Sequence, residues 1–347
     1  MDSYLQDLGY KRSLSEYTLY TKKVAGSIVV ISLYVDDILV TGNDCKQINQ
    51  LKHDLMQTFE MTDLGVMTYF LGMEIKQSPG EIFICQKKYL KEILRRFRME
   101  ECKSVGTPMN QKEKLQKEDG AEPTDNATYR SLVGCLMYLT ATRPDIQYTV
   151  SVLLRFLHCA SELHMKAAKR VLRYLKGTSS YGIKFTKSER FKLYGYSDSD
   201  WAGSVEDMKS TTSYCFAMGS VCFSWCSKKQ DIVALSTAEA EFIAATAAAN
   251  HAIWLRKLLT DLGFTVGETE LNVDNQAALA ISQNHVFHGK TKHFKVKFYY
   301  LREVQKSGEI KLVYCSTENQ YADIFTKPFQ VDRFEWLRKQ IGVCSSI

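Results

Sequence analysis

Residues 193–203, LYGYSDSDWAG, hold the pattern that decides the fold of this chain. Aromatic and small residues alternate from Leu193 to Ser197, as expected for a β-strand with one buried face. Asp198 follows this strand and leads into the Trp-Ala-Gly sequence. An acid at the end of a buried strand is a candidate for chemistry as well as for a turn.

Strand and helix patterns alternate after this first strand. Two β-rich runs follow, 213–218 and 221–225, and the Gly-Ser pair between them predicts a three-stranded meander. An alanine-rich helix is expected from Ser236 or Thr237, either of which can cap it, to about Leu262. The later patterns predict strands at 271–273 and 310–315, and helices to about 283, over 292–306 and over 319–326. A mixed sheet with helices packed on it satisfies this order.

Four acids in this region stand where structure alone does not require a charge. Asp198 and Asp274 each follow a strand. Glu241 and Asp323 lie in helices beside apolar neighbours. Taken singly, they could be a turn residue, a helix N-cap and two half-exposed helix charges. Taken together, two strand ends and two helices of one small sheet can converge on a single spot, where four carboxylates repel one another unless divalent cations neutralise them.

Carboxylate oxygens select Mg²⁺ or Mn²⁺. Two such ions about 3.5–4 Å apart serve phosphoryl chemistry, because one lowers the pKa of an attacking water and the other stabilises the leaving 3′ oxygen. No covalent nucleophile is needed. The sequence therefore predicts a two-ion centre with Asp198, Glu241, Asp274 and Asp323 as catalytic ligands.

Six motifs occur in order: GYSDSDWAG (195–203), SKKQ (227–230), LSTAEAEF (235–242), DN (274–275), TKH (291–293) and YADIFTKP (321–328). They resemble the ribonuclease H (RNase H) domain of Ty1/copia-type retrotransposon polyproteins. The family's acidic quartet carries over to the four acids named above, with Asp200 and Glu239 as nearby acids of secondary rank. The resemblance implies an enzyme that cuts the RNA strand of an RNA–DNA hybrid with two Mg²⁺ or Mn²⁺ ions.

Three positions depart from the family's usual pattern, and none is one of the four acids. Lys295 stands where an acid is common, Tyr299 where a histidine is common, and Ser213 where glycine is common. Substrate binding in this family implies phosphate contacts, for which the candidates are Lys228, Lys229, Lys290, Lys292 and Arg302.

Three histidines, His285, His288 and His293, form an H-x2-H-x4-H pattern. A zinc site is one interpretation, but no further ligand follows at a suitable spacing. A loop histidine that assists proton transfer or product release, as RNase H enzymes often use, is another interpretation for His288 or His293. A histidine without a role is the third.

The sequence YVDDI, residues 34–38, lies between β-rich runs and predicts a hairpin with Asp36 and Asp37 near its tip. It resembles the reverse-transcriptase hairpin in which two aspartates form a metal-binding pair near the primer 3′ end. The alternative, a plain Asp-rich turn, is disfavoured by the flanking Tyr and Ile. Residues 70–75 resemble the family's primer-grip hairpin. The basic helix after Gln86 is either a thumb that lies along phosphates or a solvated charged face.

Polymerase chemistry needs a further aspartate from an earlier palm strand. Only Asp2, Asp7 and Glu16 precede the hairpin, and none of them ends an apolar strand. We therefore expect no polymerisation by this chain alone, although an upstream Pol segment could supply the missing palm in trans. Nucleotide incorporation by the isolated chain in a primer-extension assay would contradict this expectation.

The expected fold class combines α/β and α+β. A truncated reverse-transcriptase palm and thumb fills residues 1–110, a linker and a helical connection 111–190, an RNase H-like mixed sheet with flanking helices 191–330, and a tail 331–347. The motifs around 129–146 and 173–178 resemble the family's connection segment. The expected function is that of a retrotransposon Pol fragment with RNase H activity. The alternative is a catalytically inactive remnant that binds nucleic acid.

The composition agrees with a folded protein that has a polyanionic partner. Of the 347 residues, 45% are hydrophobic and 24% charged, and the formal net charge is +6. The ten cysteines form no paired framework and are expected as reduced thiols. No apolar signal region and no run of 18 apolar residues occurs, so neither a secretory signal nor a spanning helix is expected. The expected location is intracellular, in the cytoplasm or nucleus.

Overall fold

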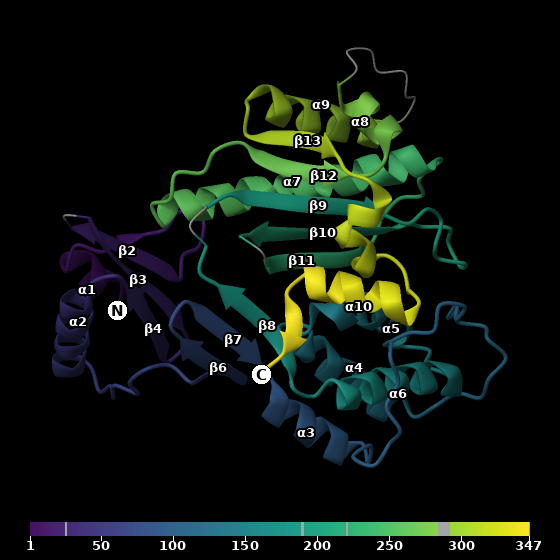
Figure 1. The fold of residues 1–347 in the computed structure, drawn as a ribbon, viewed down its shortest axis with the longest axis horizontal. Helices are drawn as coiled ribbons and strands as arrows, with labels where there is room; N and C mark the ends of the chain where they lie inside the picture. The colour runs from purple at the N-terminus through teal and green to yellow at the C-terminus, as the bar shows by residue number, and fades with distance from the viewer. Residues whose placement is uncertain (25, 189–190, 220, 284–291, 347) are drawn as a thin grey trace. The chain divides into compact units, whose positions relative to one another are not determined.

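The computed structural model describes residues 1–24, 26–188, 191–219, 221–283 and 292–346. It divides the chain into two compact units. Unit 1 comprises Met1–Met67 with His251–Gly267, and unit 2 comprises Thr68–Asn250 with Glu268–Ile347. The division falls inside helix α7, Thr237–Asp261, which therefore contributes residues to both units (Figure 1).

Unit 1 is built on a four-stranded antiparallel sheet in the order β1-β2-β3-β4. Val29 and Ile31 of β3 are fully buried and belong to one core cluster with Leu51 and Leu55 of α2. The expected hairpin is present, with a tight turn at Val35 and Asp36 and the strand β4 beginning at Asp37. The elements are α1 Asp2–Asp7, β1 Lys11–Arg12, β2 Leu19–Val24, β3 Ser27–Tyr34, β4 Asp37–Gly42 and α2 Cys45–Thr58.

Unit 2 contains the mixed sheet that the sequence predicts, with strand order β11-β10-β9-β12-β13. The first three strands form the antiparallel meander, and β12 lies parallel to both β9 and β13. The expected α/β and α+β class, with a mixed sheet and flanking helices, is confirmed. The strands are β9 Leu193–Ser199, β10 Thr211–Met218, β11 Val221–Lys229, β12 Thr269–Val273 and β13 Ile310–Tyr314.

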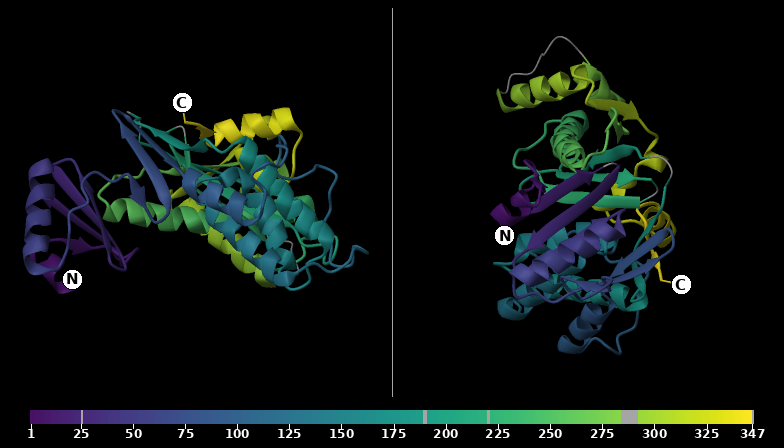
Figure 2. Two further views of the ribbon diagram at one scale, coloured as in Figure 1. Left: turned by 90° about the horizontal axis from the view of Figure 1, so that it is seen from below. Right: turned by 90° about the vertical axis from the view of Figure 1, so that its left-hand side faces the viewer.

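Helices flank this sheet. The first half of α7 and α9, Lys292–Lys306, lie on the same face (Figures 1 and 2). The helical region expected after residue 129 consists of α4 Asn126–Leu139, η1 Pro144–Ile146, α5 Gln147–Leu153, η2 Leu154–Phe156 and α6 Glu162–Gly177. Its buried hydrophobic residues belong to a single core cluster with Cys215 and Ala217 of β10 and Val221 and Cys222 of β11. Among the described helices, including the short α8 Gln276–Gln283, none is long and apolar enough to cross a membrane.

A second five-stranded sheet of unit 2, in the order β14-β8-β7-β6-β5, corrects two expectations. The expected tail is wrong for residues 331–345, because they include α10 and the strand β14, which pairs with β8. The burial of Phe334 and Leu337 explains this, since a short helix needs such tertiary packing. The strand β8 was not predicted. The elements are β5 Tyr69–Phe70, β6 Met73–Ser78, β7 Glu81–Cys85, β8 Tyr181–Thr186, α10 Val331–Gln340 and β14 Val343–Ser345.

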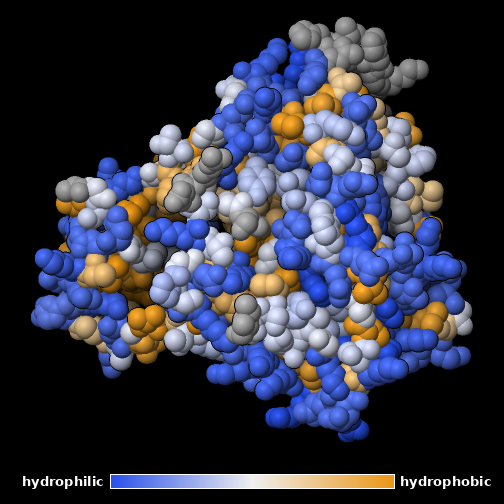
Figure 3. All heavy atoms as spheres, in the orientation of Figure 1, coloured by the Kyte–Doolittle hydropathy of each residue, from blue (hydrophilic) through white to orange (hydrophobic). Residues whose placement is uncertain are grey.

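Residues 68–110 belong to the same compact unit as the mixed sheet, and β7 pairs with β8. The domain boundary expected at residue 110 is therefore wrong, because residues on both sides of it belong to unit 2. Helix α3, Lys87–Arg96, buries Leu90 and Leu94 and turns its basic residues outward. The hydrophilic surface at the lower edge of Figure 3 covers this helix. All ten cysteines are free thiols.

Candidate metal centre

The parallel pairing of β9 with β12 brings two of the predicted acids together. Tyr196 of β9 is opposite Asn272 of β12. Asp198 lies two residues beyond Tyr196, and Asp274 two residues beyond Asn272, directly after β12 ends. Side chains two positions apart on a strand share a face, and both acids therefore lie at the same end of the same face. Asp198 is only 3% exposed.

Asp323 comes to this spot from a short helix rather than from a strand. The expected helix 319–326 is two 3₁₀ turns, η3 Thr317–Asn319 and η4 Tyr321–Phe325, and Asp323 lies in the second. Gln320 caps η4 and donates from Nε2 to the carbonyl oxygen of Ser197 at 2.9 Å. On the neighbouring strand, the Ser213 hydroxyl donates to the carbonyl oxygen of Ala322 at 2.9 Å. These two bonds fix η4 over β9 and β10.

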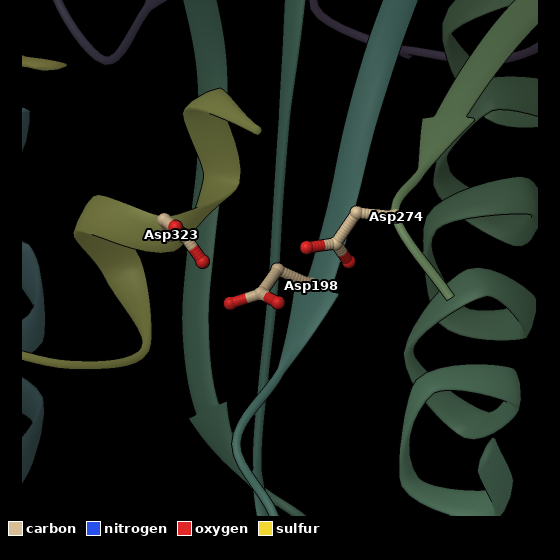
Figure 4. Close-up of side chains that lie close together, drawn as sticks. All are labelled: Asp198, Asp274 and Asp323. Atoms are coloured by element: carbon tan, nitrogen blue, oxygen red, sulfur yellow. The ribbon is translucent and has the colours of Figure 1, made fainter. Parts of the chain in front are cut away.

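The carboxylates of Asp198, Asp274 and Asp323 point toward one another (Figure 4). One oxygen atom from each lies within 4.8 Å of the other two. Two side chains orient the group: the Thr326 hydroxyl donates to the Asp198 carboxylate, and the Thr317 hydroxyl donates to Asp274 Oδ2 at 2.9 Å. Among the described residues, this is the one group of three or more Asp, Glu, His or Cys side chains spaced for an ion.

Glu241, the fourth predicted acid, lies in the first turns of α7 but is not part of that close group. Alanines on the same side of the helix, such as Ala244, are fully buried and let α7 approach the sheet. Burial, followed by the negative charges of Asp198 and Asp274, raises the pKa of Glu241 to about 10. Its Oε2 atom is buried, with no hydrogen-bond partner in the described part of the chain.

Two further acids of the site also hold their protons more tightly than usual. Burial and the nearby charge of Asp198 raise the pKa of Asp323 to about 7. Burial raises the pKa of Asp200 to about 6, although Asp200 accepts a hydrogen bond from the Thr211 amide. A divalent cation that entered this cluster would displace the protons.

Lys327 was missed as a site residue. Its Nζ lies 2.5 Å from Asp323 Oδ1. Burial works against the charged form, but the carboxylates of Asp198 and Asp323 outweigh it and raise the pKa of Lys327. The signal was present in the sequence, because Lys327 follows Asp323 by four positions, the spacing of helical ion pairs.

The other predicted site residues are placed as follows. Asp36 and Asp37 are exposed at the tip of the β3–β4 hairpin in unit 1. Lys228 is exposed at the end of β11, while Lys229 pairs with Asp207 at 2.9 Å.

Arg302 is partly buried on α9. Glu239 has a structural role, because its side chain accepts from the Leu235 amide at 2.8 Å at the start of α7. His285, His288 and Lys290 lie outside the described residues, as do the side chains of Lys292, His293 and Lys295.

The donor set fits a hard divalent cation. All the converging groups are carboxylates, which Mg²⁺ and Mn²⁺ prefer. The buried Oε2 atom of Glu241 lacks a donor, and an incoming ion would satisfy it. With one ammonium against four acids, the centre has room for further positive charge.

Comparison with known proteins relates the chain to reverse transcriptases and to Pol polyproteins of transposons. The family described as "Reverse transcriptase (RNA-dependent DNA polymerase)" matches residues 1–111. The retrovirus-related Pol polyprotein from transposon RE1 of Arabidopsis thaliana is 38% identical over 98% of this chain, which covers 23% of that protein. The corresponding polyprotein from transposon TNT 1-94 of Nicotiana tabacum is 37% identical over 99% of this chain, which covers 27% of it.

Solved structures give weaker similarity. RNase H1 from the archaeon Halobacterium salinarum matches 39% of this chain and 94% of its own, with 16% identity and a TM-score of 0.28. The foamy viral protease-reverse transcriptase in complex with an RNA/DNA hybrid matches 83% of this chain and 36% of its own, with 13% identity and a TM-score of 0.47.

The chain spans about a quarter of the length of the Pol polyproteins that it matches. The match nevertheless extends over nearly all of its own residues, across both compact units. By this similarity, and by the motifs that carry its converging acids, the chain belongs to the family of Pol polyproteins from copia-type retrotransposons.

Proposed function

We propose that unit 2 hydrolyses the RNA strand of an RNA–DNA hybrid with two Mg²⁺ or Mn²⁺ ions. The observation that carries the proposal is the convergence of Asp198, Asp274 and Asp323 within 4.8 Å. These three residues, with Glu241, would hold the ions. When bound, the ions would supply an activated water and neutralise charge on the phosphate and the leaving oxygen.

In this reaction, water attacks the scissile phosphorus and the bond to the 3′ oxygen breaks. Because water attacks the phosphorus directly, no covalent enzyme intermediate forms, and the products are a 5′ phosphate and a 3′ hydroxyl. Thr326 and Thr317 keep the carboxylates of Asp198 and Asp274 in place through their hydroxyl donors. Lys327 adds a fixed positive charge at the same spot, which favours an anionic phosphate.

Substrate recognition by shape and by 2′-hydroxyl contacts fits a chain whose basic residues are spread over several elements. Lys228, Lys229, Lys292 and Arg302 are the proposed phosphate contacts. The outward basic face of α3 is a further candidate, because counterion release would strengthen binding at low salt. We also propose that Asp36 and Asp37 represent the polymerase pair. No third ligand joins them within the described residues, and polymerisation by the chain alone is not expected.

The direct test is cleavage of an end-labelled RNA–DNA hybrid by the full chain. We expect a ladder of RNA fragments in Mg²⁺, no cleavage in EDTA, and no cleavage of the matching DNA duplex. Salt-dependent binding of the hybrid without any cleavage, in either Mg²⁺ or Mn²⁺, would contradict the proposal. That result would instead indicate an inactive nucleic-acid-binding remnant.

The raised pKa values predict a pH dependence of stability. In the ion-free fold Asp323 titrates near 7 and Glu241 near 10, whereas in the unfolded chain both titrate near 4. Above pH 4 the folded state therefore binds more protons than the unfolded state, and stability decreases as the pH rises. In EDTA, the midpoint temperature of unfolding should fall between pH 5 and 8 more steeply for the natural chain than for Glu241→Gln. Mg²⁺ should raise it most at the higher pH. Equal slopes for the two proteins would contradict this assignment.

A further inference from the structure

A cavity of about 180 Å³ lies beside the carboxylate cluster, wholly within unit 2. One wall comes from the segment that includes Met109 and Leu115, and another from α5 and η2 through Tyr148 and Arg155. The remaining wall comes from the loop after β9, which includes Val205, and from residues 326–328. Asp200, Thr326 and Lys327, which lie next to the metal centre, therefore border a common space with the helical connection.

Two residues join this cavity to the metal centre. Thr326 lines the cavity and donates its hydroxyl hydrogen to the Asp198 carboxylate. Lys327 lines the cavity and pairs with Asp323. A strand whose phosphate lies at the carboxylate cluster would therefore pass the mouth of the cavity with an adjacent nucleotide.

The polar groups of the cavity suit a ribose with its phosphate. Arg155 and Lys327 are positive, and Lys114 forms no ion pair within the described residues. Three acids also line the space, Glu113, Asp200 and Glu206, and Glu206 accepts a hydrogen bond from the backbone amide of Lys117 at 2.7 Å. Asp200 supplies a carboxylate that could accept a hydrogen bond from a sugar hydroxyl. Positive charge for a phosphate thus lies close to an acceptor for a ribose.

The size of the cavity limits the occupant. Sites for complete small ligands usually measure about 300–1,000 Å³, so this cavity holds only part of a longer ligand. A paired base would have to leave its duplex to enter, which costs a few kcal/mol, whereas the sugar-phosphate backbone is already on the outside. The backbone of the cut strand satisfies both limits.

We propose that this cavity is a subsite for one ribose-phosphate unit of the RNA strand, next to the bond that is cut. The proposal rests on the proposed RNase H function and adds a contact from the helical connection. Filling the cavity should weaken the hold on the RNA strand and leave the carboxylate cluster intact.

The test compares the natural chain with Val205→Trp, which fills the cavity from a partly exposed loop, and with Val205→Ala as the matched control. Hybrids that carry a single 2′-O-methyl group at each successive RNA position are cut, and the fragment ladder is read. For the natural chain, a 2′-O-methyl group at one fixed distance from a cutting position should block the cut there. In Val205→Trp, a methyl group at that distance should no longer block the cut. The KM for the unmodified hybrid should rise about tenfold in Val205→Trp, which corresponds to one lost charge-assisted contact, with kcat nearly unchanged. Identical ladders and KM values for all three proteins would overturn the subsite.

Binding of the labelled hybrid in EDTA separates this inference from the nuclease assignment, because it requires no cleavage. Weaker binding by Val205→Trp in a chain that does not cut would retain the subsite and reject the nuclease. Normal cutting by Val205→Trp, with unchanged binding of the hybrid, would retain the nuclease and reject the subsite. Adenosine 5′-monophosphate that binds the natural chain but not Val205→Trp, and that displaces no hybrid from either protein, would assign the cavity to a free nucleotide and overturn the strand as its occupant. If Val205→Trp does not fold, Leu115→Trp fills the same cavity from a different segment of the chain.

Discussion

Asp198→Asn is expected to abolish cleavage of the RNA–DNA hybrid while the protein stays folded. Asp198 lies within 4.8 Å of both Asp274 and Asp323, and its negative charge acts on both of them. The substitution removes this charge from the centre of the ligand group. Loss of several kcal/mol of charge stabilisation in the transition state corresponds to a fall in kcat of about 10³-fold or more. Single-turnover cleavage in Mg²⁺ measures this effect.

The same substitution should stabilise the ion-free protein, because it removes one member of a repelling cluster. The midpoint temperature of unfolding in EDTA should therefore rise for Asp198→Asn and stay unchanged for Asp231→Asn, an exposed acid of the same unit. Asp231→Asn should also cut the hybrid at the natural rate. Residual cleavage by Asp198→Asn within tenfold of the natural rate would exclude Asp198 as an essential ligand.

Asp145→Ala is expected to be the most destabilising single change in the helical connection. Asp145 and Arg143 form a fully buried bidentate pair, with distances of 2.7 and 2.9 Å. The Tyr174 hydroxyl donates to the same carboxylate, and Arg338 of α10 donates to Tyr174 at 3.0 Å. Removal of Asp145 leaves a buried, unpaired guanidinium, which costs about 3–5 kcal/mol.

For a unit of this size, that loss lowers the midpoint temperature of unfolding by roughly 10 °C. Glu335→Ala is the matched control, because the exposed Glu335 side chain lies 3.6 Å from the same Arg338. An ion pair with an exposed carboxylate contributes about 1 kcal/mol or less, so the control should unfold within about 3 °C of the natural chain. If calorimetry gives equal shifts for the two variants, the buried network does not hold α10 to the connection as described.

The convergence of the acids could be foreseen because the pattern of each element was local. The alternation from Leu193 to Ser197 and the apolar run before Asp274 both mark strand ends, and parallel neighbours bring such ends to one edge of a sheet. The meander and the alanine-rich helix could be predicted for the same reason. The 3₁₀ form of Tyr321–Phe325 was not, since it depends on bonds from Gln320 and Ser213 to distant parts of the sheet.

The features that the sequence did not reveal depend on long-range packing. The strand β8 is recognised only by its pairing with β7, about 100 residues earlier in the chain, and with β14. Helix α10 is polar over much of its surface and becomes stable by burying Phe334 and Leu337. The buried pair of Arg143 and Asp145 reads in the sequence as two ordinary surface charges, because burial of a charge has no local signature.

The central claim is that the carboxylates of unit 2 hold a pair of divalent ions. Anomalous X-ray scattering from crystals of the full chain grown with Mn²⁺ and a hybrid tests it most directly. The account predicts two Mn²⁺ peaks about 3.5–4 Å apart, with ligands from Asp198, Glu241, Asp274 and Asp323. An absence of Mn²⁺ from this cluster, with the hybrid bound and Lys327 still paired with Asp323, would contradict it.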